Sequence, residues 1–372
     1  MGGAISCGAL YRVRRPLSNL GEPVATRRAY LDHAATTPLL PQAREAMADA
    51  LARWANPSSP HAEGRAAKAA LEDARARVGA ALDWNGKIIF TSGASEALAI
   101  AFRWAHSGCF VSAVEHDAVF RAAPGAQRLA VGPDGSVAIA DVACEARLIA
   151  VQHANNETGV LQPLDDIAGT VREARGLLVA DCAQTAGKLP LPDADMIAIS
   201  AHKFGGPPGV GALLVRDFGL IEPVGGQEQG YRPGTENLPG IIGMAAALET
   251  SGAWMANAAA LRERLEERLL AAGGEIVGVA APRIATIGAY RMPGVASAAQ
   301  LIQFDMAGIA VSAGSACSSG SLKPSHVLAA MGIDEAAARE VVRVSFASST
   351  TEAEVDRFAD LWVEMAQKRR AA

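Results

Sequence analysis

Short apolar runs alternate with amphipathic segments over the first two thirds of the chain. Apolar residues recur at helical spacing after Pro41, between Ala67 and Val78, and within 163–175. The apolar runs between and after these helices are 87–90, 109–116, 148–154, 177–184, 196–200 and 211–215. Strands that are apolar on both faces and separated by helices indicate a buried sheet. The pattern therefore predicts an α/β fold, with a mostly parallel sheet between helices.

The pattern changes near residue 250. A charged helix is expected over 256–272, and short strands and a helix near 297–307 follow it. A strand at 341–346 and an amphipathic helix at 351–368 end the chain. We expect three parts: a flexible N-terminal extension (1–28), a large domain (29–250) and a smaller α+β C-terminal domain (251–372).

Composition narrows the class of protein. The chain has 372 residues and a net charge of −5, which gives no electrostatic reason to expect nucleic acid as a partner. No apolar run reaches the roughly 18 residues of a membrane span, so no membrane attachment is predicted. Five irregularly spaced cysteines indicate a reducing, cytoplasmic location, and the scattered histidines predict no metal site. The arginine-rich extension also resembles a transit peptide, and its first residues formally fit a myristoylation pattern.

Polar residues follow the predicted strands. In a parallel sheet the carboxyl ends of the strands meet at one edge, where ligands bind. We therefore expect a site there. The residues at these strand ends are Ser95, His116, Asn156, Asp181, Gln184 and Lys203.

Lys203 follows the apolar strand 196–200 and precedes a turn rich in glycine and proline. Desolvation lowers the pKa of a lysine and makes its amine nucleophilic, as a Schiff-base lysine requires. The alternative is a strand whose last residue points to solvent.

The strand-end residues fit pyridoxal 5′-phosphate (PLP) better than other cofactors. Lys203 would hold the aldehyde, Asp181 would pair with the pyridine nitrogen, and Gln184 would donate to the ring hydroxyl. Ser95, at a helix N-terminus, would bind the phosphate, and His116 would lie on the ring. Each residue also has an ordinary alternative, such as a helix cap, a capped turn or a core histidine.

Two further residues suggest chemistry. Cys317 lies in GSACSSGS, where glycines and serines favour an exposed, flexible loop, so its thiol could accept an atom from a substrate. It could also be an incidental surface cysteine. Arg343 lies within the apolar strand VVRVSF and needs a counter-charge. This counter-charge could be the carboxylate of a substrate or an acidic side chain in an internal salt bridge, and the sequence leaves both possibilities open.

Eight motifs carry a resemblance in matching order over about residues 29–368. They are YLDHAATTP, TSGASEA, VEHDAV, HANNETG, DCAQTAGK, SAHKFGGPPGVGAL, RPGTEN and VSAGSACSSGSLKPSHVL. Together they resemble the NifS/IscS-like cysteine desulfurases, which are class V aminotransferase relatives with PLP fold type I.

The resemblance implies a role for each matching residue. Lys203 resembles the Schiff-base lysine, Cys317 the thiol that becomes a persulfide, and His116 the histidine that stacks on the ring and handles protons. Asp181 and Gln184 resemble the partners of the pyridine nitrogen and the ring hydroxyl. The implied phosphate contacts are Ser95, Ser200 and His202, and Ala94 and Asn156 are further implied cofactor contacts. The implied substrate contacts are Asn156 and Arg343.

Thr235 resembles a threonine contributed by the neighbouring subunit, which implies a homodimer. The implied activity converts L-cysteine to L-alanine and passes sulfur to an acceptor or an iron–sulfur scaffold protein. Alternatives are a selenocysteine lyase, a small-amino-acid aminotransferase, or an interaction protein that has lost the cofactor. An aminotransferase has no need of Cys317.

Overall fold

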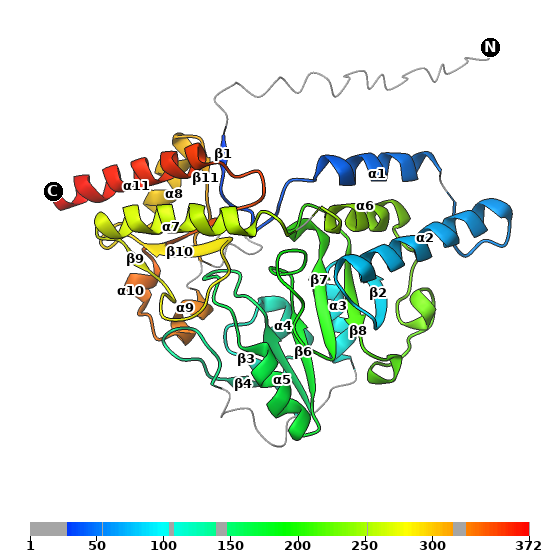
Figure 1. Ribbon diagram of the computed structural model, residues 1–372. Coiled ribbons are helices and arrows are strands. Elements are labelled where there is room, and N and C mark those ends of the chain that lie inside the picture. The colour runs from blue at the N-terminus through cyan, green and yellow to red at the C-terminus, as the bar shows by residue number, and fades with distance from the viewer. Residues whose placement is uncertain are drawn as a thin grey trace, which may run out of the picture.

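The structure is a computed structural model and describes residues 28–53, 55–103, 108–138, 147–250, 252–314 and 325–371. A large sheet flanked by helices occupies one side of the molecule, and the C-terminal helices and short strands occupy the other (Figure 1). The α/β class predicted from the apolar runs is confirmed.

Seven strands of the described residues form the large sheet. In spatial order they are β2 (Lys87–Thr91), β8 (Gly211–Val215), β7 (Met196–Ser200), β6 (Leu177–Asp181), β5 (Leu148–Gln152), β3 (Cys109–Ser112) and β4 (Gln127–Leu129). β8 is antiparallel to both β2 and β7, and every other pairing is parallel. All strands except β8 therefore run in one direction, and their carboxyl ends share one edge.

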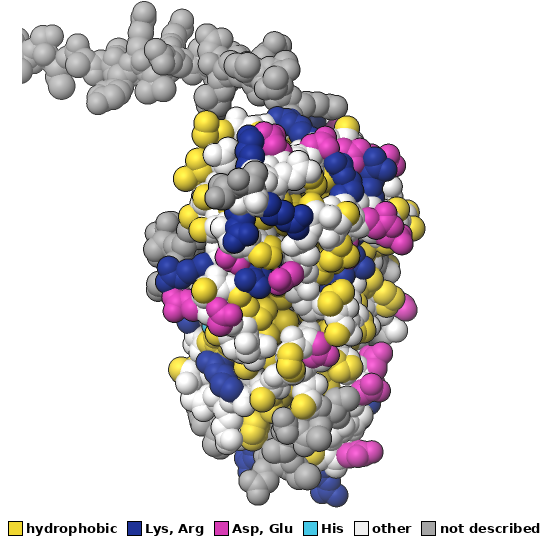
Figure 2. Space-filling model, turned by 90° about the vertical axis from the view of Figure 1, so that its left-hand side faces the viewer, with side chains coloured by type: hydrophobic (Ala, Val, Ile, Leu, Met, Phe, Trp, Pro, Cys, Tyr) yellow, Lys and Arg dark blue, Asp and Glu magenta, His cyan; other side chains and the backbone are white. Residues whose placement is uncertain are grey.

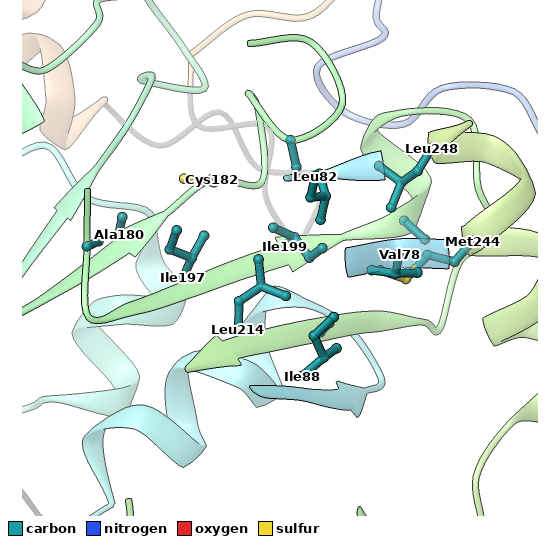
Figure 3. Packing of buried hydrophobic residues seen from close by; sticks show 14 of the residues in the cluster. Val78, Leu82, Ile88, Ala180, Cys182, Ile197, Ile199, Leu214, Met244 and Leu248 are labelled. Carbon is teal, nitrogen blue, oxygen red and sulfur yellow. The ribbon is translucent and has the colours of Figure 1, made fainter. Parts of the chain in front are cut away.

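Helices cover both faces of this sheet because successive side chains of each strand point to opposite sides. Ile197 and Ile199 pack with helices α1 (Pro41–Ala52), α2 (Ala62–Ala81), α5 (Leu164–Glu173) and α6 (Leu238–Leu248). Met196 and Ala198 pack with α3 (Ala94–Phe102) and α4 (Asp117–Ala122) on the other face. Figure 3 shows Val78 of α2 and Met244 of α6 close to each other, in the cluster that also contains Ile199.

The C-terminal part has its own core. Its elements are α7 (Met255–Ala271), β9 (Glu275–Ile276), β10 (Ile287–Arg291), α8 (Ser297–Met306), β11 (Ile309–Ala310), α9 (His326–Ala330), α10 (Glu335–Ala338), β12 (Val341–Ser345) and α11 (Glu352–Ala371). β12, β10 and β9 form an antiparallel sheet. β1 (Ala29–Tyr30) pairs with β11, so the first described residues pack within this part.

Basic and acidic side chains are interspersed over the face of this C-terminal part (Figure 2). In the portion of the chain that the structure describes, no helix is both long and apolar enough to cross a membrane.

Gly211 brings β8 close to the turn that follows β2. A Cβ at this position would lie 2.4 Å from the Ile199 carbonyl oxygen and 2.6 Å from the Gly93 Cα. Because both neighbours are backbone atoms, Gly211→Ala should lower the free energy of unfolding by about 1–3 kcal/mol, the cost of overpacking a core. Chemical denaturation measures this. Gly169→Ala, in α5, is the control, since among the described residues no atom beyond its chain neighbours and its own helix backbone lies within 4 Å of a Cβ there. Equal stability of Gly211→Ala and wild type would contradict the packing described.

Candidate active site

A cavity of about 440 Å³ lies at the carboxyl edge of the large sheet. Asp181 ends β6 and Ser200 ends β7, and both line it. Arg343 of β12 and His326 of α9 close it from the C-terminal part. Its size and its mixture of apolar and convergent polar groups suit a small organic ligand.

Most residues expected at the site line this one cavity. Those that do are Ala94, Ser95, His116, Asn156, Asp181, Gln184, Ser200, His202, Lys203 and Arg343. Thr235 is exposed and is absent from the lining. Cys317 lies outside the described residues. Sequence-distant strand ends thus converge, as the parallel sheet led us to expect.

Lys203 ends a single 3-10 turn, η3 (Ala201–Lys203), that follows β7. Its Nζ donates to the carbonyl oxygens of Ala34 (2.6 Å) and Ala35 (2.9 Å). The amine is therefore held at the cavity wall by the loop after β1, which excludes the alternative of a lysine that points to solvent.

Asp181 is buried, and its Oδ1 accepts a hydrogen bond from the Ala183 amide at 2.9 Å. Burial raises the pKa of this carboxyl, although the amide and the positive charges of His116 and Lys203 act in the opposite direction. A cationic ring nitrogen opposite Asp181 would favour its ionised form.

His116 caps α4, because its Nδ1 accepts from the Ala118 amide at 3.1 Å. The proton of the neutral ring must then lie on Nε2. Burial lowers the pKa of His116 and the charge of Lys203 lowers it further, while Asp181 raises it. A neutral imidazole that lines the cavity can receive or donate a proton.

The turn between β2 and α3 presents backbone amides. Gly93 precedes α3 with φ of 150°, and it contributes no side-chain cap. The positive helix end therefore remains available to an anion such as a phosphate. Beside it, His202 Nδ1 lies 3.2 Å from Thr36 Oγ1. Burial and the charge of Lys203 lower the pKa of His202 to about 4, so this ring is neutral near pH 7.

Two side chains at the cavity have buried atoms left unpaired. Gln184 Nε2 donates to the Ala34 carbonyl at 3.0 Å, and its Oε1 has no hydrogen-bond partner among the described residues. Arg343 donates from Nη2 to Asp32 Oδ1 (2.7 Å) and from Nη1 to the Asn156 carbonyl (2.9 Å), and its Nε is likewise unpaired within the described ranges. Buried polar atoms without partners are rare and point to a missing ligand or water.

Arg343 therefore has an internal salt bridge, one of the two roles left open by the sequence. The arginine is buried and the aspartate is half-buried, with 6% and 18% of the Arg343 and Asp32 side chains exposed. Ser312 Oγ also donates to Asp32, at 2.8 Å from Oδ2. These contacts hold the guanidinium at the cavity wall, which is compatible with binding a carboxylate there.

Sequence reasoning missed residues that the tertiary structure adds to the site. His326 lines the cavity, and its Nε2 donates to the Glu115 carbonyl at 2.8 Å. The buried Glu157 accepts from Ser325 Oγ at 2.6 Å. Ser325 and His326 lie in the sequence KPSHVL, and this motif was the feature of the sequence that could have identified them. No cluster of metal-ligating side chains occurs among the described residues.

The family model for aminotransferase class-V proteins matches residues 29–358. The chain belongs to this family. It is 36% identical to a cysteine desulfurase of Cereibacter sphaeroides, over 92% of this chain and 97% of that protein. It is 38% identical to a cysteine desulfurase of Klebsiella pneumoniae, with 89% and 90% covered. A NifS-like protein of Rickettsia africae has a similar structure, with a TM-score of 0.84, 29% identity, and 91% and 99% covered.

The cofactor of this family is PLP, and the residues present fit it. A nucleophilic amine, a buried carboxylate and an uncapped helix N-terminus line the same cavity. The unpaired Gln184 Oε1 can accept a hydrogen bond from a ring hydroxyl. This direction differs from the donation expected from sequence, because Nε2 already donates to Ala34.

Proposed function

We propose that this chain is a PLP-dependent cysteine desulfurase, which converts L-cysteine to L-alanine and takes the sulfur onto Cys317 as a persulfide. The observation that carries the proposal is the convergence of Lys203, Asp181 and Arg343 on one cavity. Identities of 34–38% to proteins named cysteine desulfurase support it.

Lys203 would hold the cofactor covalently, and Asp181 would pair with its ring nitrogen. Gln184 would bind the ring hydroxyl, and His116 would lie against the ring. When bound, PLP supplies an electron sink for negative charge that develops on the substrate. The proposed phosphate contacts are Ser95, Ser200 and His202, with Thr235 from a second subunit. Ala94 and Asn156 are proposed as further cofactor contacts.

Substrate binding is assigned to Arg343 and Asn156. The guanidinium would pair with the amino acid's carboxylate, while Asp32 and the Asn156 carbonyl keep it in place. This orients the α-carbon for proton removal by the Lys203 amine. The carbonyl oxygens of Ala34 and Ala35 already hold that amine at the cavity wall.

Sulfur transfer needs a reactive thiol. Cys109 and Cys182 are buried, and burial raises the pKa of both thiols, which disfavours the nucleophilic thiolate. We assign the transfer to Cys317, because the segment GSACSSGS resembles the part of the cysteine desulfurases that carries the persulfide-forming thiol. Its sulfur forms a bond to the substrate sulfur as the carbon–sulfur bond breaks, and the proton equivalents pass to the alanine. One cysteine and one thiol give one alanine and one persulfide, so no external oxidant or reductant is needed.

Cys317→Ser should abolish production of alanine and sulfide from L-cysteine while leaving the visible absorbance of bound PLP intact. The reason is that a hydroxyl cannot accept the sulfur. Amino-acid analysis and a sulfide assay measure the two products, and Cys7→Ser is the matched control. Alanine release that persists in Cys317→Ser would contradict the proposal and favour a lyase; keto-acid formation would favour an aminotransferase.

We also propose a cytoplasmic homodimer that passes its sulfur to an acceptor or an iron–sulfur scaffold protein. The exposed position of Thr235, away from the cavity of its own chain, supports a contribution to a neighbour's site. The division into a large domain (29–250) and a small domain (251–372) remains a proposal as well.

A further inference from the structure

An ion pair adjoins the turn between β2 and α3, where the phosphate is proposed to bind. Glu96 lies in the first turn of α3 and lines the large cavity beside Ser95. Its Oε1 accepts a hydrogen bond from Arg232 Nε at 3.0 Å, and its Oε2 accepts from the Ser92 amide at 2.5 Å. The side chains of Glu96 and Arg232 are 28% and 19% exposed, so both charges are half-buried.

A carboxylate at this place opposes the binding of a phosphate. Both anions are attracted to the positive N-terminus of a helix, and like charges at close range disfavour each other. Burial raises the pKa of Glu96, but the hydrogen bonds from Ser92 and Arg232 outweigh it and the net shift is downward. Glu96 is therefore ionised near pH 7, and its charge must be neutralised before the turn can readily receive a phosphate.

Arg232 belongs to a loop that Glu228 anchors to the sheet. The Glu228 side chain is 1% exposed, accepts from the Phe90 amide of β2 at 2.9 Å, and pairs with Arg75 Nη1 of α2 at 2.7 Å. Glu228 and Gln229 have φ of 50° and 59°, in the left-handed region. This conformation is strained for residues other than glycine and persists where surrounding contacts fix it. The loop is therefore fixed to the strand that leads into the phosphate turn.

We propose that Arg232 is a positioning residue for the phosphate of PLP: it neutralises Glu96, and the turn before α3 can then bind the anion. Arg232 is absent from the residues that line the cavity, so it acts through Glu96 and not on the phosphate itself. The same loop carries Thr235, which we assign to the phosphate site of the neighbouring subunit, so one loop serves two sites. The inference rests on the proposed function, because the phosphate belongs to the cofactor proposed there.

The test compares a ligand that carries the phosphate with one that lacks it. Full-length protein is freed of cofactor and titrated with PLP and, separately, with pyridoxal, and the visible absorbance of the bound form gives the Kd of each. Arg232→Gln should raise the Kd for PLP by about 5-fold or more and leave that for pyridoxal within about twofold of wild type. A purely structural role would weaken the binding of both ligands alike, and that result would overturn the proposal.

Glu96→Gln tests whether Arg232 acts through the carboxylate. In this background no negative charge needs to be neutralised, so adding Arg232→Gln should change the Kd for PLP by less than about twofold. An equal loss of PLP affinity in both backgrounds would overturn the proposal, because Arg232 would then act on the phosphate directly. Arg77→Gln is the matched control. It breaks a half-exposed ion pair with Glu249, whose residues do not line the cavity, and should leave both constants unchanged.

If Arg232→Gln does not fold, Arg232→Lys replaces it. Lysine keeps the charge but loses the planar group that bonds the carboxylate, so a smaller rise confined to PLP is expected, and an unchanged Kd for PLP would overturn the proposal. The readout requires no turnover. Wild-type protein that binds no PLP would contradict the proposed function and with it the inference, whereas wild-type affinity for PLP in Arg232→Gln would contradict the inference alone.

Discussion

Lys203→Ala is expected to remove the visible absorbance band of the purified protein and to abolish alanine formation. The variant lacks the amine that we propose holds PLP covalently and removes the substrate's α-proton. Loss of general-base catalysis alone costs about 10²–10⁴-fold in rate. The carbonyl oxygens of Ala34 and Ala35 also lose the donor that Lys203 provides, so the free energy of unfolding should fall as well.

Absorption spectroscopy after gel filtration and an alanine assay measure these effects. Lys68→Ala removes an exposed lysine of α2 and serves as the control. A Lys203→Ala protein that still retains covalently bound, coloured cofactor would contradict the assignment. A colourless wild-type protein that cannot be loaded with PLP would favour the interaction-protein alternative.

Arg343→Ala should raise the KM for L-cysteine while the absorbance of bound PLP remains. The variant lacks the guanidinium that we propose pairs with the substrate's carboxylate. Removing one partner of such a buried, hydrogen-bonded charge pair costs about 2–5 kcal/mol of binding free energy, which corresponds to a rise of at least about 30-fold in KM. The folded protein should also be less stable, because the half-buried Asp32 loses its counter-charge.

Asp32→Asn separates the two roles of this arginine. It keeps the size of the side chain but removes the charge that orients Arg343, so we expect a smaller rise in KM than in Arg343→Ala. Steady-state kinetics and denaturation measure both variants. If Arg343→Ala loses stability but keeps the wild-type KM, the arginine has only the internal salt-bridge role.

The apolar runs predicted the central sheet well because a strand buried on both faces has few polar residues. The strand predicted over 109–116 was too long, because β3 ends at Ser112 and His116 caps α4. α6 (Leu238–Leu248) was not predicted. It is apolar on all sides and almost wholly buried, so it lacks the amphipathic period that marks a surface helix.

The strand ends identified most of the candidate site because a parallel sheet brings them to one edge. The loop after β1 was not expected to take part, yet Ala34 and Asp32 contact Lys203 and Arg343. His326 was missed for the same reason. Its position depends on how distant segments pack, and it does not stand directly after a strand in the local pattern.

The central claim is that sulfur leaves L-cysteine and arrives on Cys317. Wild-type protein loaded with PLP should be incubated with L-cysteine without reductant, and both alanine and the mass of the peptide carrying Cys317 should be measured. We predict that alanine and a persulfide on Cys317 appear together, in equal amounts during the first turnover. Alanine without added sulfur on Cys317, or no alanine from the loaded protein, would contradict the proposed function.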